Sequence, residues 1–565
     1  MKNILYCIIF QLIFTPLFAQ DNYPDDYFGN PLEIGPVLAG TFAELRSNHF
    51  HGGLDIKTQQ REGLNVLATA DGYISRIKIS PWGYGKAIYI QHPNGYTTVY
   101  GHLRELAPEI EAYVKERQYK KERFAIELFP TADSMKVTKG QLIAYSGNTG
   151  GSGGPHLHYE IRDSRQHPMN PMLFGFNIKD SRKPTVNAVY GYSLTDSSQV
   201  NHHNNRVKLK LTKGDDGNYL SETVYASGVI SFGVNTYDKQ DLAHNKNGVF
   251  NIKTYINGKL NYEIDFKKFS FKESRHLNQL IDYEYFKEKK SRIQKLFKNE
   301  RNPLSIIKNV EDYGQVIINE GEQINYKIVI SDFNNNKRTV TIPIVGEKKK
   351  ITHFKDKIES PHYIYADKGI TLDDNNKQVY IPKNALYEDT PLLFETKGDT
   401  IILGDTNIPL HKNITLKFNA DKFSSEDLSK IYISGLGYND KPYFYINTYK
   451  KDGKIIGKTK YFGKFTLTSD TEKPTIKPVN TQEGKWMTKA NFLKMKITDK
   501  LSGVDKYRAT INGKWALMEY DAKKDLLSYQ FSDNIHKSGE NKFKLIVIDN
   551  VGNNSTFEMT FFRKN

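Results

Sequence analysis

The chain of 565 residues contains a single cysteine and no long apolar segment beyond its N-terminus. The cysteine, Cys7, lies inside that N-terminal segment, so a chain that has lost the segment can form no internal disulfide. Folding must therefore rest on packed cores, and the length allows roughly three to five of them. The lack of a second apolar segment predicts that the mature chain has no transmembrane segment, which would take about 20 apolar residues.

The N-terminal residues predict an exported protein. Residues 1–19 place Lys2 ahead of an apolar run that ends in Ala19, which is the pattern of a secretory signal peptide. An uncleaved membrane anchor is the alternative, but Gln11 and Pro16 interrupt the run. No lipid-attachment cysteine follows this segment, so we expect a periplasmic or secreted protein.

The formal net charge is +16, from 80 Lys and Arg against 64 Asp and Glu. A cationic protein is attracted to polyanions such as a carboxylate-rich cell wall or an anionic membrane surface. The alternative is that lysine is simply the common surface residue of this composition. Nucleic acid is not an expected partner, because export argues against it and no zinc-finger or RNP-type signature is present.

The first third of the chain predicts a compact, all-β domain. Short alternating or apolar stretches are separated by glycines, a pattern typical of β-strands. The predicted strands are Leu64–Ala70, Gly72–Ile79, Lys86–Gln91, Thr97–Tyr100, Gln141–Ser146 and His156–Arg162. Between them, Leu106, Ile110, Tyr113 and Val114 recur at helical spacing, which predicts a helical insertion over about 105–128.

The rest of the chain favours several β-sandwich domains, so the predicted fold class is mainly β. Strand-like stretches alternate with Asn-Gly and Asp-Gly turns such as Asn257-Gly258 and Asp452-Gly453, which are hairpin signals. Lys183-Pro184-Thr185 and Lys473-Pro474-Thr475 resemble each other and predict two equivalent domain starts. We expect a first domain over 20–178 and β-sandwiches over 179–346, with a charged helical insertion at about 273–299, over 347–472 and over 473–565.

Two turns of the last segment resemble those of bacterial immunoglobulin-like domains. These are Asp499-Lys-Leu-Ser-Gly503-Val-Asp505 and Ile548-Asp549-Asn-Val-Gly552-Asn553. The resemblance implies an immunoglobulin-like β-sandwich at about 473–565 and says nothing about a ligand.

Two histidine motifs of the first domain point to a metal. One is His51-Gly-Gly-Leu-Asp55 and the other is His156-Leu-His158, whose two side chains point the same way if the motif lies in a strand. Two imidazoles and a carboxylate suffice for a catalytic zinc, which keeps a position open for water, whereas a structural zinc takes four ligands, usually including cysteine. Either motif alone is weak evidence, but both occur with Tyr100-Gly-His102-Leu in one glycine-rich β domain.

With these motifs, residues 30–175 resemble the catalytic domain of the lysostaphin-type (LytM-type) peptidoglycan endopeptidases. The matching stretches are His51-Gly-Gly-Leu-Asp55-Ile56, Ala70-Asp-Gly-Tyr-Ile, Ile88-Tyr-Ile-Gln-His92, Tyr100-Gly-His102-Leu, Gly140-Gln-Leu-Ile-Ala-Tyr-Ser-Gly-Asn-Thr-Gly150 and Gly154-Pro-His156-Leu-His158-Tyr-Glu160. The resemblance implies that His51, Asp55 and His158 bind Zn²⁺ and that His102 and His156 are the catalytic histidines. The implied fold is the duplicated hybrid motif, a small antiparallel β-structure crossed by an open groove.

Three further side chains bear on this assignment. Glu160 would share a strand face with the histidines and could orient one imidazole from behind. His49 lies one strand step before His51 and is the alternative ligand if that assignment is wrong. His92 matches a family position that we interpret as structural.

The predicted function is a zinc metalloendopeptidase that hydrolyses peptide bonds of bacterial peptidoglycan. One alternative is a non-hydrolytic LytM-like activator or scaffold of envelope hydrolases, a class that commonly lacks zinc ligands, whereas this chain has the full set. The other is a peptidase of secreted or surface proteins. Expected partners are peptidoglycan and, through the C-terminal β-sandwiches, envelope proteins. The helical insertion could line the groove, cover it or lie at its edge.

Overall fold

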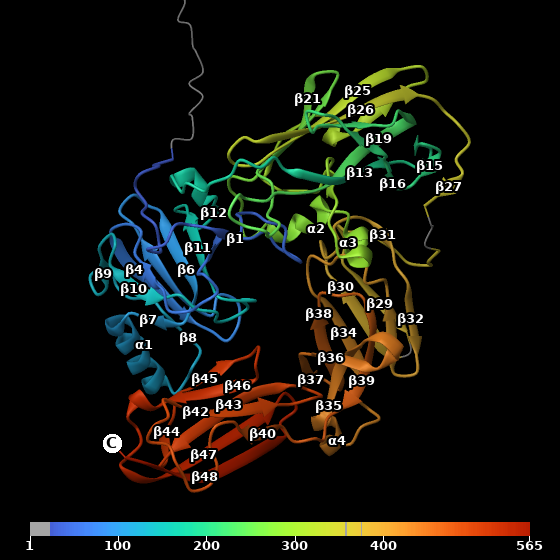
Figure 1. Ribbon diagram of the computed structural model, residues 1–565. Helices are drawn as coiled ribbons and strands as arrows, with labels where there is room; N and C mark the ends of the chain where they lie inside the picture. The colour runs from blue at the N-terminus through green and yellow to red at the C-terminus, as the bar shows by residue number, and fades with distance from the viewer. Residues whose placement is uncertain (1–22, 356–358, 375, 565) are drawn as a thin grey trace, which may run out of the picture.

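A computed structural model describes residues 23–355, 359–374 and 376–564 (Figure 1). The predicted signal peptide and Cys7 lie outside the described residues. The prediction of a mainly β protein is confirmed, because short helices interrupt a succession of β-sheets. Among the described residues, no helix combines the length and apolar character needed to cross a membrane.

The N-terminal region is built on one nine-stranded sheet. Its order is β1-β2-β11-β6-β5-β4-β8, with β12 beside β11 and β9 beside β4. The strands are β1 (Leu38–Gly40), β2 (Leu54–Lys57), β4 (Gly72–Ile79), β5 (Lys86–Gln91), β6 (Thr97–Leu103), β8 (Ile126–Leu128), β9 (Lys136–Val137), β11 (His156–Arg162) and β12 (Pro168–Met169). A smaller sheet joins β3 (Asn65–Leu67), β10 (Leu142–Tyr145) and β7 (Glu105–Leu106).

Alternating apolar residues put one face of this sheet into the core. Ile74, Ile77 and Ile79 of β4 are buried, as are Leu157 and Tyr159 of β11. Strands β4, β5 and β11 have the predicted bounds, whereas β6 continues past Tyr100 to Leu103. The continuation includes a bulge, because between the pairs Ile88–Tyr100 and Lys86–Leu103 the strand β6 has one residue more than β5.

Helix α1 (Pro108–Lys121) lies within the segment predicted to be helical. Proline at its first turn, Glu109 and Glu111 near its N-terminus and two lysines in its last turn all favour a helix in this direction. Ile110, Val114 and Gln118 face the protein interior.

The second region is dominated by a large sheet that shares its core with the first. Its longest strands are β13 (Thr185–Ser193), β19 (Val224–Tyr237), β25 (Gln323–Ser331) and β26 (Lys337–Gly346). One continuous cluster of buried side chains runs from the N-terminal sheet into this region, and Phe42 lies 5.2 Å from Phe269 between ring centroids. The two regions are therefore packed together as one hydrophobic body.

The charged segment 273–299 forms only short helices. They are α2 (Leu277–Leu280) and α3 (Tyr283–Lys289), followed by β22 (Gln294–Lys295). Leu277, Leu280, Ile281 and Ile293 all enter buried positions, and so the segment folds against the sheet in short pieces instead of forming one amphipathic helix.

The last two regions each contain two sheets around a core of their own, and every strand pair in them is antiparallel except β41 with β48, which is parallel. In the third region one sheet has the order β29 (Ile370–Asp374), β30 (Lys377–Ile381), β34, β38 (Lys454–Thr459), β37 (Thr448–Lys451) and the other has the order β32 (Phe394–Lys397), β33 (Thr400–Leu403), β39, β35 (Ile431–Leu436), β36 (Pro442–Ile446). In the fourth region one sheet has the order β40 (Thr475–Pro478), β42, β46 (Leu526–Gln530), β45 (Met518–Asp521) and the other has the order β41 (Lys485–Trp486), β48 (Asn554–Arg563), β47, β43 (Val504–Ile511), β44 (Lys514–Trp515). Their central strands are β34 (Ile414–Asn419), β39 (Gly463–Ser469), β42 (Phe492–Thr498) and β47 (Gly539–Asp549). The predicted domain boundaries stay predictions, as does the immunoglobulin-like character of the last region.

The fourth region returns to the N-terminal region and closes the chain into a ring (Figure 1). Lys115 of α1 donates to Asp533 at 2.6 Å, and Tyr119 of the same helix donates to the second oxygen of Asp533 at 2.7 Å. The ring of Tyr119 also meets Trp515 edge-on at 5.2 Å. Helix α1 thus joins the N-terminal region to the fourth region, together with an ion pair between Lys86 and Glu519 at 2.8 Å.

Candidate metal centre and active site

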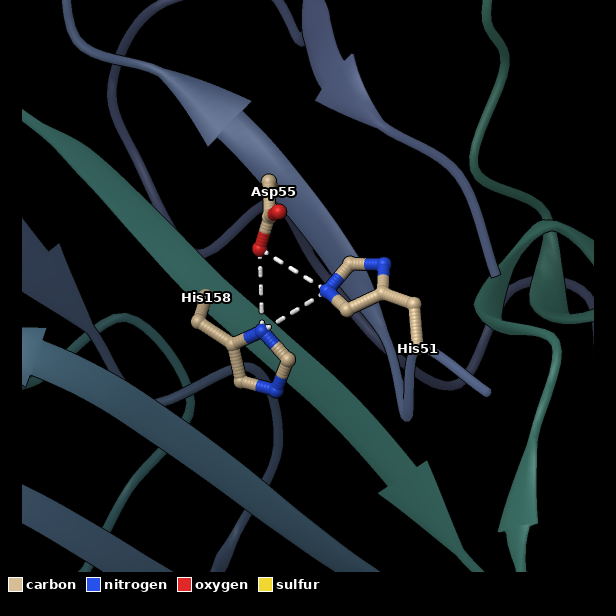
Figure 2. Close-up of side chains that lie close together, drawn as sticks. All are labelled: His51, Asp55 and His158. Carbon is tan, nitrogen blue, oxygen red and sulfur yellow. Dashed lines mark hydrogen bonds and ion pairs between the residues drawn. The ribbon is translucent and has the colours of Figure 1, made fainter. Parts of the chain in front are cut away.

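Three predicted ligands converge on one buried point of the N-terminal sheet (Figure 2). Asp55 Oδ1 lies 2.9 Å from His51 Nε2 and 2.9 Å from His158 Nδ1, and the two nitrogens are 3.1 Å apart. Zinc bonds of about 2.0–2.1 Å in tetrahedral geometry separate neighbouring ligand atoms by about 3.3 Å. The triangle is close to that size, and all three side chains are buried.

The strand register explains the convergence. His158 of β11 lies directly opposite Asp55 of β2 and, on its other side, opposite Gly101 of β6. His51 precedes β2 across two glycines. At Gly53 a Cβ atom would lie 2.1 Å from the carbonyl oxygen of Tyr159, so only glycine lets this segment approach β11.

Each imidazole is held by an acceptor on the side away from the centre. His51 Nδ1 donates to the carbonyl oxygen of Thr41 at 2.7 Å, and His158 Nε2 donates to Glu160 Oε1 at 2.8 Å. Arg46 donates to the outer oxygen of Asp55 at 2.8 Å. These bonds leave lone pairs on the three atoms that face one another, which is the donor set that a cation requires.

Glu160 is the centre of a second layer of contacts. It is fully buried, accepts from Arg162 Nε at 2.6 Å and also accepts from the hydroxyl of Tyr84. The Tyr84 ring stacks on His158 with centroids 4.8 Å apart. The position expected of Glu160 from the sequence is therefore found, whereas Tyr84 carried no sequence signal.

The two remaining predicted residues lie beside this triangle. His156 Nε2 is 3.3 Å from Asp55 Oδ1, and the rings of His102 and His156 are 4.8 Å apart. His102 Nδ1 donates to the carbonyl oxygen of Thr149, and His156 Nδ1 donates to that of Gly154, each at 2.8 Å. Nε2 is thus the atom of each ring that remains for chemistry.

His102 occupies a left-handed backbone conformation, with φ of 60°. Such a conformation is uncommon for a residue other than glycine and is found more often at functional sites. It coincides with the β6 bulge, which redirects the side chain toward the ligands instead of along the regular strand face.

The electrostatics of the centre suit a cation. Burial alone would raise the pKa of Asp55, but the neighbouring histidines hold it well below its usual range. Burial lowers the pKa of His51. Burial also opposes a charge on His158, yet its hydrogen bonds to Asp55 and Glu160 raise the pKa of that imidazole to about 9. Burial, followed by the nearby His158 and His156, lowers the pKa of His102 to about 3.

The other histidines of this region lie outside the centre. His49 is bonded to Asn48 at an exposed position, and its ring does not join the triangle of ligand atoms. His92 is bonded to the carbonyl oxygen of Asp71 and to Thr98, which is a structural setting.

Two segments of the chain match known protein families. Peptidase family M23 matches residues 49–119 and 128–171, and a Zu5-like domain matches residues 361–470. All five predicted site residues fall inside the first match, as does most of α1, since only residues 120–127 are skipped.

Similar proteins share only the N-terminal part. The DD-carboxypeptidase/endopeptidase Mpg of Neisseria meningitidis is 36% identical over 128 residues, covering 23% of this chain and 23% of the relative. The peptidoglycan DD-endopeptidase ShyA of Vibrio cholerae is 36% identical over 110 residues, covering 20% of each. The chain therefore spans less than a quarter of the length of these relatives.

Among solved structures, the catalytic domain of lysostaphin from Staphylococcus simulans is 22% identical with a TM-score of 0.19, over 25% of this chain and 93% of that chain. The family match and the curated relatives confirm the resemblance that the motifs predicted. This chain carries a peptidase family M23 domain of the lysostaphin type within residues 49–171, and a Zu5-like region over residues 361–470.

Proposed function

We propose that this protein is an exported zinc endopeptidase that hydrolyses peptide bonds of bacterial peptidoglycan. His51, Asp55 and His158 would hold Zn²⁺, and His102 and His156 would serve the reaction. The observation that best supports this proposal is the buried triangle in which two imidazole nitrogens and a carboxylate oxygen present lone pairs to one point.

The donor set fits zinc better than a hard cation. Two nitrogens and one oxygen are typical of catalytic zinc, whereas calcium and magnesium take oxygen ligands. Three protein ligands also leave a fourth position for water. Bound zinc would lower the pKa of that water and polarise the scissile carbonyl, so that hydroxide is available near neutral pH.

The chain's own residues supply the rest of the chemistry. A low pKa keeps the His102 imidazole neutral and Nδ1 donates to the Thr149 carbonyl, so Nε2 carries a lone pair that can accept a proton or a hydrogen bond. His156, 4.8 Å away between ring centroids, is placed to act on the same reacting group. We assign proton transfer and oxyanion binding to this pair.

Two further lines support the wall as substrate and export as the route. The relatives Mpg and ShyA are named as peptidases of this kind, ShyA explicitly for peptidoglycan. The N-terminal sequence has the pattern of a signal peptide, and the formal charge of +16 suits a polyanionic wall.

The test is release of soluble fragments from purified peptidoglycan by residues 20–565, with zinc supplied or chelated. Zinc-dependent release by the unaltered chain is expected, with loss of both release and bound zinc in His158→Ala. His49→Ala is the matched control, because it removes a nearby histidine outside the triangle, and it should retain both properties.

Other outcomes separate the alternatives. Bound zinc at one per chain without fragment release would contradict the hydrolase and favour an activator or scaffold. Cleavage of a denatured protein substrate but not of peptidoglycan would retain the peptidase and reject the wall as its substrate.

A further inference from the structure

Three aspartates meet at the junction of the first and second regions, away from the metal centre. Asp180 precedes β13, Asp238 follows β19 and Asp332 follows β25. One carboxylate oxygen of each lies within 4.8 Å of the others. Asp238 is 3% exposed and Asp332 is 4% exposed, so the carboxylates are largely withdrawn from water.

Within the described chain, Asp180 and Asp238 share a side-chain hydrogen bond, but the cluster has no ion-pair partner. No lysine, arginine or histidine among the described residues forms an ion pair with any of the three carboxylates. Burial, followed by the charges of Asp180 and Asp332, raises the pKa of Asp238 to about 8. Asp180 is half-buried and the other two are buried, so three such acids without an ion-pair partner are costly to ionise together unless a cation joins them.

Two polar atoms in the same place have no partner. Asp238 Oδ1 makes no hydrogen bond, and neither does Oε1 of Gln240, a side chain that is only 4% exposed. Gln240 lines the same small cavity as the three aspartates, and this cavity has a volume of about 20 Å³. About 10–15 Å³ is enough for one water, so an object of ionic size fits.

We propose that Asp180, Asp238, Asp332 and the amide oxygen of Gln240 form a Ca²⁺ site that joins the second region to the peptidase region. All four ligands are oxygens, and three are carboxylates, which is the donor set of calcium in proteins. Calcium takes six to eight oxygens, so waters would complete the shell.

A second cluster of three aspartates in the same chain serves as a comparison for the proposed calcium site. Asp470, Asp499 and Asp549 meet in the fourth region at equivalent positions, since Asp180 and Asp470 each lie three residues before a Lys-Pro-Thr sequence. Asn336 donates twice to Asp332, and Asn553 donates twice to Asp549 in the same way.

The two clusters differ in the middle aspartate. Asp499 Oδ1 accepts from the amides of Leu501 and Gly503, so the turn itself satisfies it. Asp238 Oδ1 accepts no such bonds, and the loop that begins there runs on until β20 (Asn251–Ile256) returns to the sheet. The first cluster therefore has an oxygen available for a cation where the second has a hydrogen-bonded turn.

The location couples the site to the metal centre. Thr41 lines the cavity, its hydroxyl accepts from the amide of Gly248 at 3.1 Å, and its carbonyl oxygen accepts from His51 Nδ1. A cation at the junction would hold the Asp238 loop against the segment that orients His51. The inference itself does not depend on the proposed hydrolysis.

The test titrates CaCl₂ into the zinc-saturated mature chain and follows both heat of binding and Tm. One Ca²⁺ per chain is expected, with a rise in Tm of about 5 °C when calcium exceeds its Kd about 100-fold. Asp238→Asn should abolish the calcium response, while its Tm at pH 7 without calcium stays close to that of the unaltered chain, because a carboxyl with a pKa of about 8 is largely neutral there, like the amide that replaces it.

Asp499→Asn is the matched control and should retain the full response. Gln240→Glu adds a fourth carboxylate to the proposed site. We therefore expect tighter calcium binding and, in calcium-free buffer, a lower Tm than that of the unaltered chain. The proposal is overturned if the unaltered chain binds no calcium, if Asp238→Asn keeps the response, or if Asp499→Asn loses it.

Discussion

At the residue scale, the proposed zinc site depends on groups that hold the proposed ligands as well as on those ligands themselves. Glu160 binds His158 on the side away from the triangle and is itself held by Arg162. An acceptor in this position fixes the tautomer and orientation of a metal-binding imidazole.

Replacing Glu160 with glutamine tests that role. Because the neutral amide is a weaker acceptor for His158 Nε2, we expect zinc affinity to fall about 10–100-fold. Competition with a chromophoric chelator measures this directly. Glu127→Gln, at a partly exposed carboxylate that pairs with Arg76, is the control and should leave affinity unchanged. Equal affinity in both variants would show that Glu160 does not support the ligand.

Gly53 is a second residue whose identity the structure requires. A Cβ at this position would overlap the carbonyl of Tyr159, so Gly53→Ala should lower the free energy of unfolding by about 3 kcal/mol or displace His51. Gly35→Ala is the control, because a Cβ there meets nothing within 4 Å. Denaturant unfolding that found the two variants equally stable would contradict the crowding.

Individual site residues differ in whether the sequence alone could predict them. His51, Asp55 and His158 were predicted because their side-chain chemistry and spacing are visible in the sequence. The carbonyls of Thr41, Thr149 and Gly154, which hold three of the histidine rings, were not, since any residue type offers a carbonyl oxygen.

At the scale of elements, helix α1 has a role that its sequence did not reveal. The three roles considered from the sequence were lining, covering or bordering the groove, but its residues Lys115 and Tyr119 bind Asp533 of the fourth region. Strands β4, β5 and β11 were predicted with their bounds because alternation is a local signal. The partner of α1 lies more than 400 residues away in sequence, beyond the reach of any local pattern.

The contribution of the contact between α1 and the fourth region to stability can be measured by removing a buried acceptor, Asp533, and an exposed one, Glu122, in separate variants. The Asp533 side chain is 2% exposed, so Asp533→Ala takes this acceptor from Tyr119, leaves Lys115 with the amide oxygen of Gln530, and should cost about 2 kcal/mol. Glu122→Ala removes the exposed partner of Arg508 at the same contact and should cost much less, because solvent screens this ion pair. Thermal unfolding of the two variants measures the difference, and equal losses would mean that Asp533 does not anchor the contact.

At the scale of the whole molecule, the ring brings the C-terminal region to the loop that holds His102 and His156, the two histidines proposed to be catalytic. Lys523 Nζ donates to the carbonyl of Ser152 at 2.9 Å and to the carbonyl of Asn148. Between those residues lies Thr149, whose carbonyl holds His102, and just beyond lies Gly154, whose carbonyl holds His156. The N-terminal and second regions share a hydrophobic core. Neither this core nor the contact with the fourth region could be predicted from the sequence, because both join residues that are far apart in the chain and meet only in the folded protein.

Lys523→Ala therefore tests whether the closed ring supports catalysis. Without the ammonium, the loop 147–154 loses a tie to a separate region, and small displacements of His102 and His156 should lower kcat about 5–10-fold while zinc stays bound at one per chain. Lys524→Ala is the matched control, since Lys524 is largely exposed and pairs only with Asp521 of its own turn. Fragment release from peptidoglycan under saturating zinc gives the rates. An increase in rate would mean instead that the C-terminal region restricts access to the site, and equal rates for both variants would mean that the contact carries no catalytic consequence.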